Sequence, residues 1–380
     1  MMEFSDLAAI ILAGGFSQRM GRFKPLLPLG DHRTIERVVR MFQDAGIDEI
    51  LVVVGHRGDD IRRVVDPLNV VCVENPDYAE GMFTSVLAGV RALPEQCRAF
   101  FMHPVDIPMV RWQTVRRLAE TGKNSSAVVL YPTFDGRRGH PTLIRSCLGP
   151  QILQWSGMGG LRSFLQGHET DSLELPVADE AVLMDLDTPG DYRRMMDRLS
   201  GEGLPTEAEC RKLMEGLPAA VAAHCRAVAA VARCLAASVR AAGLDIDVEL
   251  VRTAALLHDI ARTGKDHARV GACLLETHGF TRLAPIVAAH MDLEADRGRS
   301  LDEIQIVHLA DKLVIGDQLA DLEQRFARKM EKYGQDPAAA AAIARRRDTA
   351  RDISAKVARI VGMDVEAIVK TVKTDLGAPR

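Results

Sequence analysis

The sequence predicts an α/β domain followed by an all-α domain, and two observations separate them. In the first half of the 380-residue chain, short runs rich in Val, Ile and Phe alternate with amphipathic segments. Such alternation is typical of βαβ units, so we expect a Rossmann-like domain with a mostly parallel sheet. After LSGEGLPTE (199–207), strand-like runs give way to alanine-rich helical periods. The expected organisation is an α/β domain over 1–199, a linker over 200–208, an all-α domain over 209–333 and a helical extension over 334–380.

The strand and helix predictions for the first half rest on hydrophobic periodicity. Two amphipathic stretches, 33–46 and 83–94, carry apolar residues at helical spacing. The expected strands are the five apolar runs at 8–13, 49–55, 70–75, 99–106 and 126–132.

The composition limits the classes of partner. The chain is 47% hydrophobic and 26% charged, with a net charge of −4 and only 4% aromatic residues, so nucleic-acid binding is not expected. Seven cysteines without a CxxC pair favour reduced thiols over a disulfide framework. The first apolar run is too short for a signal peptide or a membrane span. We therefore expect a cytoplasmic protein that binds neither nucleic acid nor a membrane.

The stretch LAGGFSQRMGRFK (12–24) directly follows the first expected strand. Its glycine spacing does not match a Walker A loop or GxGxxG. A glycine turn at the carboxyl end of a parallel strand still lets backbone N–H groups approach an anion, and Arg19 and Lys24 can bind phosphate oxygens. The alternative is an ordinary βα turn with solvated basic residues.

The whole segment LAGGFSQRMGRFKPLL resembles the signature of the MobA-like nucleotidyltransferases, especially the molybdenum cofactor cytidylyltransferases. The resemblance covers about residues 6–198 and implies a fold of the nucleotide-diphospho-sugar transferase type. It continues in the segments NPDYAEGMFTSVLAGV (75–90), HPVDIPMV (103–110), RGHPTLI (138–144) and MDLDTPGDY (184–192).

This resemblance implies a role for each matched residue. Asp106 and Asp187 would hold Mg²⁺, His140 would face the acceptor substrate, and Lys24, Arg19 and Asp106 would be catalytic, with no protein nucleophile. The implied nucleotide-binding residues are Leu12, Ala13, Gly14, Gly15, Arg19, Lys24, Gly81 and Ser85.

Local alternatives remain for several of these residues. Asp106 could be the N-cap of a following helix, and Asp187 could simply begin a helix at DTPGD. Ser85 could be a cap residue and His140 a turn residue. Gly15 stands where the cytidylyltransferase branch usually has alanine and the guanylyltransferase branch has a glycine pair, so GTP stays open. The SxRMGxxK pattern resembles the cytidylyltransferase branch and favours CTP.

Histidines and aspartates recur along the helical half. His224 lies in an apolar stretch, His258 and Asp259 are adjacent, and His267, His290 and Asp311 follow on later helices. A lone histidine on an apolar helix is more often a hydrogen-bonded core residue than a ligand. Several together, with a costly buried His–Asp pair, favour a metal site between the helices.

The order of these residues resembles the HD-domain metal-dependent phosphohydrolases over roughly 207–333. The resemblance implies that one divalent transition metal, such as Mn²⁺, Fe²⁺, Ni²⁺ or Zn²⁺, is held by His224, His258, Asp259 and Asp311. His267 and His290 would complete a second metal site or contact a phosphate. Asp259 would also be catalytic by orienting the attacking water. Lys265 is a candidate for phosphate binding, and His308 is expected to be structural or to lie outside the site.

Together these predictions describe a bifunctional enzyme. The first domain is expected to transfer a nucleotidyl group, CMP from CTP, to a molybdopterin-type cofactor with release of pyrophosphate. The HD domain is expected to hydrolyse a phosphoester. A molybdenum hydroxylase or its maturation factor is a candidate partner. The alternative is a nucleotidyltransferase for a sugar or polyol phosphate, with the HD domain as a nucleotide-sensing or dimerisation module.

Overall fold

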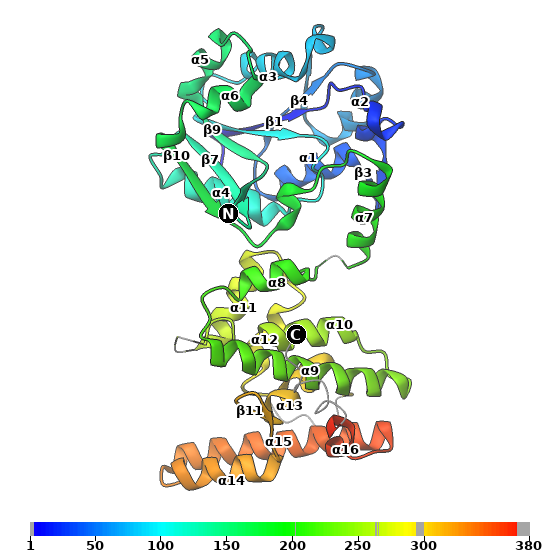
Figure 1. Cartoon of the computed structure of the whole chain (residues 1–380), viewed down its shortest axis with the longest axis vertical. Helices are drawn as coiled ribbons and strands as arrows, with labels where there is room; N and C mark the ends of the chain where they lie inside the picture. Colours follow the sequence, from blue (N-terminus) through cyan, green and yellow to red (C-terminus); the bar gives the residue numbers. More distant parts are fainter. Residues whose placement is uncertain (1–3, 202, 263, 265, 294–299, 371–380) are drawn as a thin grey trace. The chain divides into compact units, whose positions relative to one another are not determined.

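The computed structural model divides the chain into two compact units, Met1–Glu202 and Gly203–Arg380. We call them the α/β unit and the helical unit, and Figure 1 shows their elements. The described residues are 4–201, 203–262, 264, 266–293 and 300–370.

The α/β unit is built on one eight-stranded sheet with the order β10-β7-β9-β6-β1-β4-β5, in which β8 pairs with β7. A small hairpin, β2 (Pro28–Leu29) and β3 (His32–Arg33), stands apart from it. The strands of the sheet are β1 (Leu7–Leu12), β4 (Glu49–Val54), β5 (Val71–Glu74), β6 (Ala99–Pro104), β7 (Val129–Phe134), β8 (Arg137–Arg138), β9 (Thr142–Arg145) and β10 (Ser172–Pro176).

The sheet is mostly parallel, which confirms the predicted fold class. β1 pairs in parallel with β4 and β6, β4 with β5, and β7 with β10. β9 runs antiparallel between β6 and β7, and β8 runs antiparallel to β7. Two strands were not among those expected: β9, which overlaps the matched segment RGHPTLI (138–144), and β10, whose residues are largely exposed.

Helices cover both faces of this sheet (Figure 1). On one face, Ile10 and Phe100 pack in a core with Val86 of α3. On the other, Phe42 of α1 lies 5.6 Å from Phe101, centroid to centroid. The helices are α1 (Thr34–Asp44), α2 (Gly58–Val65), α3 (Met82–Arg91), α4 (Trp112–Lys123), α5 (Gly149–Gln154), α6 (Gly160–Gln166) and α7 (Pro189–Ser200).

The helical unit has a single apolar core to which both the expected domain and the expected extension contribute. Val228 of α9 and Ile306 of α13 share that core with Ile353 of α15 and Ile368 of α16. The elements are α8 (Glu207–Leu213), α9 (Ala219–Ala241), α10 (Val248–Leu257), α11 (His267–Thr277), α12 (Ala284–Ala289), α13 (Glu303–Lys312), β11 (Val314–Ile315), β12 (Gln318–Leu319), α14 (Leu322–Tyr333), α15 (Pro337–Val361) and α16 (Val365–Lys370).

Helix α9 is long and apolar enough to cross a membrane by length and composition alone. A helix in the middle of a protein core meets the same criteria. Its buried side chains, including Val231 and Leu235, belong to the core of the helical unit, and we assign them to packing.

Candidate functional sites

The first candidate site begins where β1 ends. Ala13 N–H donates to Val53 O at 2.9 Å, so the chain leaves the sheet beside β4. Gly14 then passes so close to α3 that a Cβ atom there would lie 3.1 Å from Ser85 Oγ. Farther along, Ser17 Oγ accepts a hydrogen bond from Lys24 N–H at 3.0 Å and closes the loop. The glycine is thus required by a close approach of loop and helix.

Lys24 lies at the centre of this site. Its side chain is buried, and Nζ lies 2.6 Å from Asp187 Oδ1 and 3.3 Å from Asp106 Oδ2. Arg19 Nη1 reaches Asp187 Oδ2 at 2.9 Å from an exposed position. These charge-assisted bonds, with that of Lys24 as the largest effect, hold the pKa of Asp187 below its usual value. Four predicted residues therefore meet at the carboxyl edge of the sheet.

The backbone explains why Asp106 and Asp187 meet although they are 81 positions apart in sequence. Leu186 N–H donates to Asp106 O at 2.7 Å, which fixes the two segments side by side. Neither aspartate is a helix cap. Thr188 caps α7, and α4 begins six residues after Asp106, with Arg111 as its N-cap residue. Both carboxylates are therefore available to the site.

A third carboxylate, Asp185, was not predicted from the sequence. Partial burial and the negative charges of Asp106 and Asp187 raise the pKa of Asp185. Oxygen ligands from crowded carboxylates are what Mg²⁺ prefers, so the donor set fits the expected cation, with Asp106 and Asp187 as holders. The signal for Asp185 was present in the sequence, since the period-two spacing of DLD aligns its two aspartates in an extended segment.

A polar network lines the side of the loop near α3. The buried amide of Asn75 donates to Thr84 Oγ1 and Ser85 Oγ, both at 2.9 Å. Gly81, with φ of 123°, precedes α3 and its carbonyl accepts from Thr84 Oγ1 at 2.8 Å. The predicted residues Gly81 and Ser85 thus lie in one network, and Asn75 was not predicted.

His140 lies near the charge of Asp106 rather than in contact with it. Its Nδ1 atom is buried and has no hydrogen-bond partner within the described chain. Burial lowers the pKa of His140, while the Asp106 carboxylate opposes that shift. The side chain is therefore a neutral imidazole with a free ring nitrogen.

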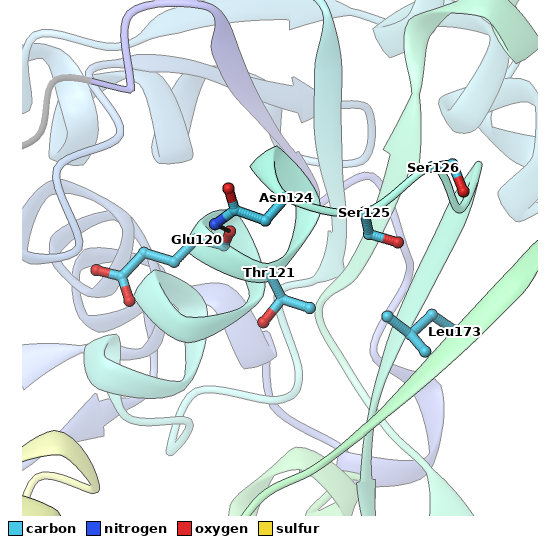
Figure 2. Close-up of a pocket in the computed structure, with 6 residues that line it drawn as sticks. All are labelled: Glu120, Thr121, Asn124, Ser125, Ser126 and Leu173. Carbon is cyan, nitrogen blue, oxygen red and sulfur yellow. Dashed lines mark hydrogen bonds between the residues drawn. The ribbon is translucent and has the colours of Figure 1, made fainter.

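A surface hollow of about 640 Å³ lies elsewhere on this unit (Figure 2). It is lined by Glu120, Thr121, Asn124, Ser125, Ser126 and Leu173, where α4 ends and β10 begins. This is the amino-terminal edge of β7 and β10, opposite the edge at which open α/β sheets bind ligands. None of the candidate catalytic residues lines it.

The second candidate site lies inside the helical unit, where Asp259 joins two groups of side chains. Asp259 Oδ2 lies 3.3 Å from His258 Nε2 and 4.0 Å from His224 Nε2. Asp259 Oδ1 lies 3.2 Å from His267 Nε2 and 3.5 Å from His290 Nε2. The possible ligand atoms within each group lie within 4.8 Å of one another.

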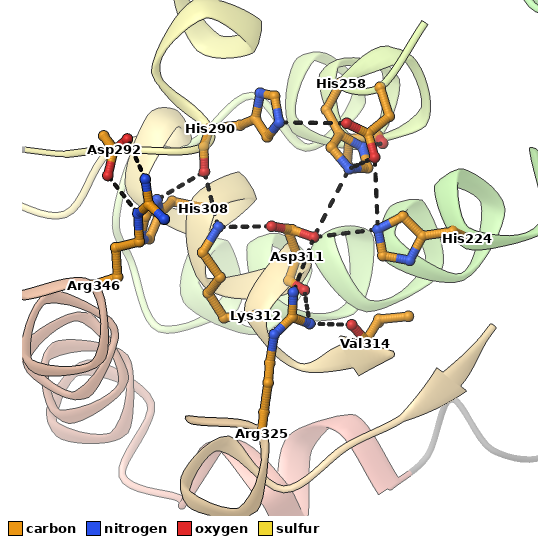
Figure 3. A network of polar contacts seen from close by, with 12 residues as sticks. His224, His258, His290, Asp292, His308, Asp311, Lys312, Val314, Arg325 and Arg346 are labelled. Atoms are coloured by element: carbon orange, nitrogen blue, oxygen red, sulfur yellow. Dashed lines mark hydrogen bonds and ion pairs between the residues drawn. The ribbon is translucent and has the colours of Figure 1, made fainter. Parts of the chain in front are cut away.

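Asp311 extends the first of these groups. Its Oδ1 atom lies 3.2 Å from His224 Nε2 and 3.9 Å from His258 Nε2 (Figure 3). All six residues predicted for the HD site are thus brought together. They come from α9, the end of α10, α11, the end of α12 and α13.

The histidines are oriented by backbone carbonyls. The Nδ1 atoms of His224, His258 and His290 each lie 2.7 Å from a carbonyl oxygen, those of Gly316, Ala255 and Val287. A carbonyl can only accept, so Nδ1 carries the proton in each ring and Nε2 presents a lone pair to the carboxylates. Lone pairs facing carboxylate oxygens repel unless a cation or a proton lies between them.

The cluster therefore fits a divalent metal. Nε2 of His258, His267 and His290 and Oδ1 of Asp259 are buried and have no hydrogen-bond partner among the described residues. Such orphaned atoms are costly unless they ligate. Burial alone would lower the pKa of His258, but the Asp259 and Asp311 carboxylates raise it to about 10, so the site strongly favours positive charge. Nitrogen and oxygen ligands suit the transition metals named above.

Basic residues surround this centre. Arg262 Nη1 contacts Asp259 Oδ2, and Lys312 Nζ lies 2.7 Å from Asp311 Oδ2. Arg262, which stands three residues after Asp259, was not predicted. Lys265, the residue predicted for that role, lies outside the described residues.

His308 is structural, as predicted, in the sense that it supports the backbone of a ligand. Its Nδ1 atom donates to His290 O at 2.9 Å, and Lys312 Nζ donates to the same carbonyl at 3.2 Å. Burial lowers the pKa of His308 to about 3, so its ring is neutral. These bonds fix the segment that carries His290 (Figure 3).

Comparison with known proteins assigns both units. The sequence model of the MobA-like NTP transferase domain matches residues 9–173, and that of the HD domain matches residues 221–315. In class, the chain is a nucleotidyltransferase joined to an HD domain. It belongs to the MobA-like NTP transferase family.

Individual relatives cover the α/β unit. The chain is 30% identical over 196 residues to the molybdenum cofactor cytidylyltransferase of Escherichia coli K12, covering 51% of this chain and 97% of that protein. It is 41% identical over 118 residues to the bifunctional IPC transferase and DIPP synthase of Rubrobacter xylanophilus, covering 30% of this chain and 26% of that protein. The crystal structure of Rv0371c from Mycobacterium tuberculosis H37Rv is similar at a TM-score of 0.45 and 24% identity, covering 52% of this chain and all of that one.

Proposed function

We propose that the chain is a bifunctional enzyme that transfers CMP from CTP to a molybdopterin-type acceptor and hydrolyses a phosphoester in its helical unit. The observation that carries the first activity is the contact of buried Lys24 with Asp106 and Asp187 beside the glycine loop. The similarity to a molybdenum cofactor cytidylyltransferase supports the choice of nucleotide and acceptor.

The residues of the α/β unit act by positioning and by charge. Loop N–H groups, Arg19 and Lys24 bind the triphosphate, and the acceptor phosphate then attacks the α-phosphorus in line. The bond to the β-phosphate breaks and pyrophosphate leaves with that bridging oxygen. Mg²⁺ held by Asp106 and Asp187 would offset the negative charge of the phosphates. To contact the leaving pyrophosphate, Lys24 must lose part of its contact with Asp106 and Asp187.

The experiment is pyrophosphate release by the full-length protein with Mg²⁺ and each of the four NTPs, with and without a molybdopterin acceptor. Release that needs both CTP and the acceptor supports the proposal. Release with GTP alone would move the enzyme to guanylyl transfer. If no pyrophosphate is released with any of the four nucleotides, with or without the acceptor, the proposed reaction is contradicted.

A second acceptor class is supported by a separate observation. The segment that is 41% identical to the bifunctional IPC transferase and DIPP synthase has a higher identity than the longer match to the molybdenum cofactor enzyme. The acceptor class to set against molybdopterin is a sugar or polyol phosphate. Including such phosphates in the same assay decides between the two classes, because only the true acceptor will stimulate pyrophosphate release.

For the helical unit, metal-dependent phosphoester hydrolysis is supported by the two ligand groups that share Asp259. His224, His258, Asp259 and Asp311 would hold one metal, and Asp259, His267 and His290 a second. A divalent metal lowers the pKa of a coordinated water. Arg262 is placed to bind a phosphate, because its guanidinium already reaches Asp259 from a half-exposed position. Hydrolysis of bis-p-nitrophenyl phosphate, lost on chelation and restored by Mn²⁺, tests this activity.

A further inference from the structure

The segment that follows the HD match carries cations toward the metal-ligand cluster. The match ends at residue 315, and α14 and α15 come after it. Arg325 of α14 reaches back to α13, with Nη1 donating to Asp311 O at 2.7 Å and Nη2 lying 3.8 Å from Asp311 Oδ1 (Figure 3). Lys329 follows one turn later on the same face of α14, about 6 Å along the helix axis from Arg325.

Lys329 has no counter-ion among the described residues. Its side chain is half-buried and forms neither a hydrogen bond nor an ion pair within the part of the chain that the structure describes. Burial, followed by the positive charges of Arg325 and Lys312, lowers the pKa of Lys329 to about 8. An unpaired ammonium among cations costs stability, so its position calls for an anion.

Arg325 also has an N–H group that makes no hydrogen bond among the described residues. Its side chain is only 11% exposed, and its Nε–H is buried without a hydrogen-bond partner among the described residues. The Nη1 atom is occupied by the carbonyls of Asp311 and Val314, which fix the guanidinium in place. A planar guanidinium held in this way is suited to bind a phosphate oxygen.

The charges around the cluster do not balance. Four basic residues, Arg262, Lys312, Arg325 and Lys329, lie near the two carboxylates of the cluster, those of Asp259 and Asp311. Arg346 does not alter this balance, because it forms a bidentate pair with Asp292 at 2.6 and 2.7 Å. Divalent metal ions at the cluster would engage both carboxylates and increase the excess of positive charge.

We propose that Arg325 and Lys329 form an anion site for the outer phosphoryl group of a substrate whose inner phosphoryl group lies at the metal-ligand cluster. The substrate class is then a chain of at least two linked phosphates, either pyrophosphate or the phosphates of a nucleotide. This inference rests on the proposed hydrolase function of the helical unit. It gives the segment after residue 315 a role that neither family match includes.

The test is calorimetric titration of orthophosphate, pyrophosphate and CTP into the full-length chain at pH 7. Every protein in the series carries Lys24→Met, which removes the buried cation of the α/β unit and its contribution to phosphate binding. Lys329→Gln is compared with Lys332→Gln, which removes the same charge from an exposed position on the same helix. Thermal unfolding is recorded for each variant.

We expect pyrophosphate or CTP to bind more tightly than orthophosphate, and Lys329→Gln to weaken that binding about tenfold or more. Lys332→Gln should change it less than about twofold. The melting temperature of Lys329→Gln should stay equal or rise, because the substitution relieves repulsion. A lowered melting temperature would show a structural role and overturn the site, as would equal affinities of the two variants.

The failure of this inference can be told apart from failure of the hydrolase. Binding that depends on Lys329 without turnover by Mn²⁺-loaded protein keeps the anion site and contradicts hydrolysis. Turnover of a phosphoester with equal binding of pyrophosphate by Lys329→Gln and Lys332→Gln keeps the hydrolase and overturns the anion site.

Discussion

The carboxylates of the two candidate sites differ in exposure and in the groups that surround them. In the α/β unit, Asp106 and Asp187 are partly exposed and already paired with Lys24 and Arg19. In the helical unit, Asp259 is fully buried and faces four histidine nitrogens, three of which have no hydrogen-bond partner among the described residues. In the first site, lysine and arginine side chains of the same unit neutralise the carboxylates. In the second site, the carboxylates and imidazole lone pairs need an added cation or proton between them.

This difference predicts how each site uses metal. An oxygen-only site near solvent binds Mg²⁺ weakly and shares it with substrate phosphates. A buried site with oriented imidazoles binds a transition metal tightly and keeps it through purification. The α/β unit should therefore need added metal in every assay, and the helical unit should not.

The largest effect is expected from Asp259→Ala, because this residue contributes to both ligand groups of the helical unit. Losing a supporting residue of a metal ligand typically costs 10–100-fold in metal affinity, so losing the shared ligand should cost more than about 100-fold. Metal per chain, measured by plasma mass spectrometry after dialysis, should fall close to zero. Asp292→Ala, which removes a carboxylate outside both groups, is the control and should keep its metal.

The next effect is expected from Lys24→Met in the α/β unit. Removal of a fixed charge that stabilises a reacting group typically costs on the order of 10²–10³ in rate. Nucleotidyl transfer should fall by that factor, while the metal content of the helical unit stays unchanged. A loss of metal from the Lys24→Met variant would contradict this prediction, because it would show that the two sites are not independent.

A smaller effect is expected from Asp185→Asn. The substitution keeps the shape of the side chain but removes one of three crowded negative charges. The Mg²⁺ concentration for half-maximal transfer should rise about tenfold, with the rate at saturating Mg²⁺ nearly unchanged. An unchanged Mg²⁺ dependence would show that Asp185 does not contribute to the cation site.

The smallest effects distinguish the two adjacent loop glycines. A Cβ at Gly15 would meet no atom within 4 Å, whereas one at Gly14 would crowd Ser85 Oγ. Gly15→Ala should change the free energy of unfolding by less than about 0.5 kcal/mol. Gly14→Ala should lower it by about 1 kcal/mol or more. Chemical denaturation of both variants measures the difference.

Hydrophobic periodicity was sufficient for the overall fold but not for every strand. β1, β4 and β6 are continuous buried runs and were readily predicted. β9 has only four residues and follows a Gly-His-Pro turn, and β10 is a largely exposed edge strand of five residues. Both are too short to give a clear pattern in the sequence.

The candidate metal ligands could be predicted because motifs in the sequence identify them. The residues that support these ligands could not be predicted, because their contacts depend on how distant helices pack. His258 and Asp259 stand together in sequence, and the family resemblance supplied the others. Arg325 and Lys329 gave no signal because charged residues on a helix usually face solvent. Only the packing of α14 into the common core, through Phe326, turns these two cations toward Asp311.

The central claim is that two independent reactions occur in one chain. The most direct measurement is to assay nucleotidyl transfer and phosphoester hydrolysis in the same preparations of Asp106→Asn and Asp259→Asn. The account predicts that Asp106→Asn loses transfer and keeps hydrolysis, and that Asp259→Asn does the reverse. Loss of both activities in either variant, with the fold intact by circular dichroism, would contradict it.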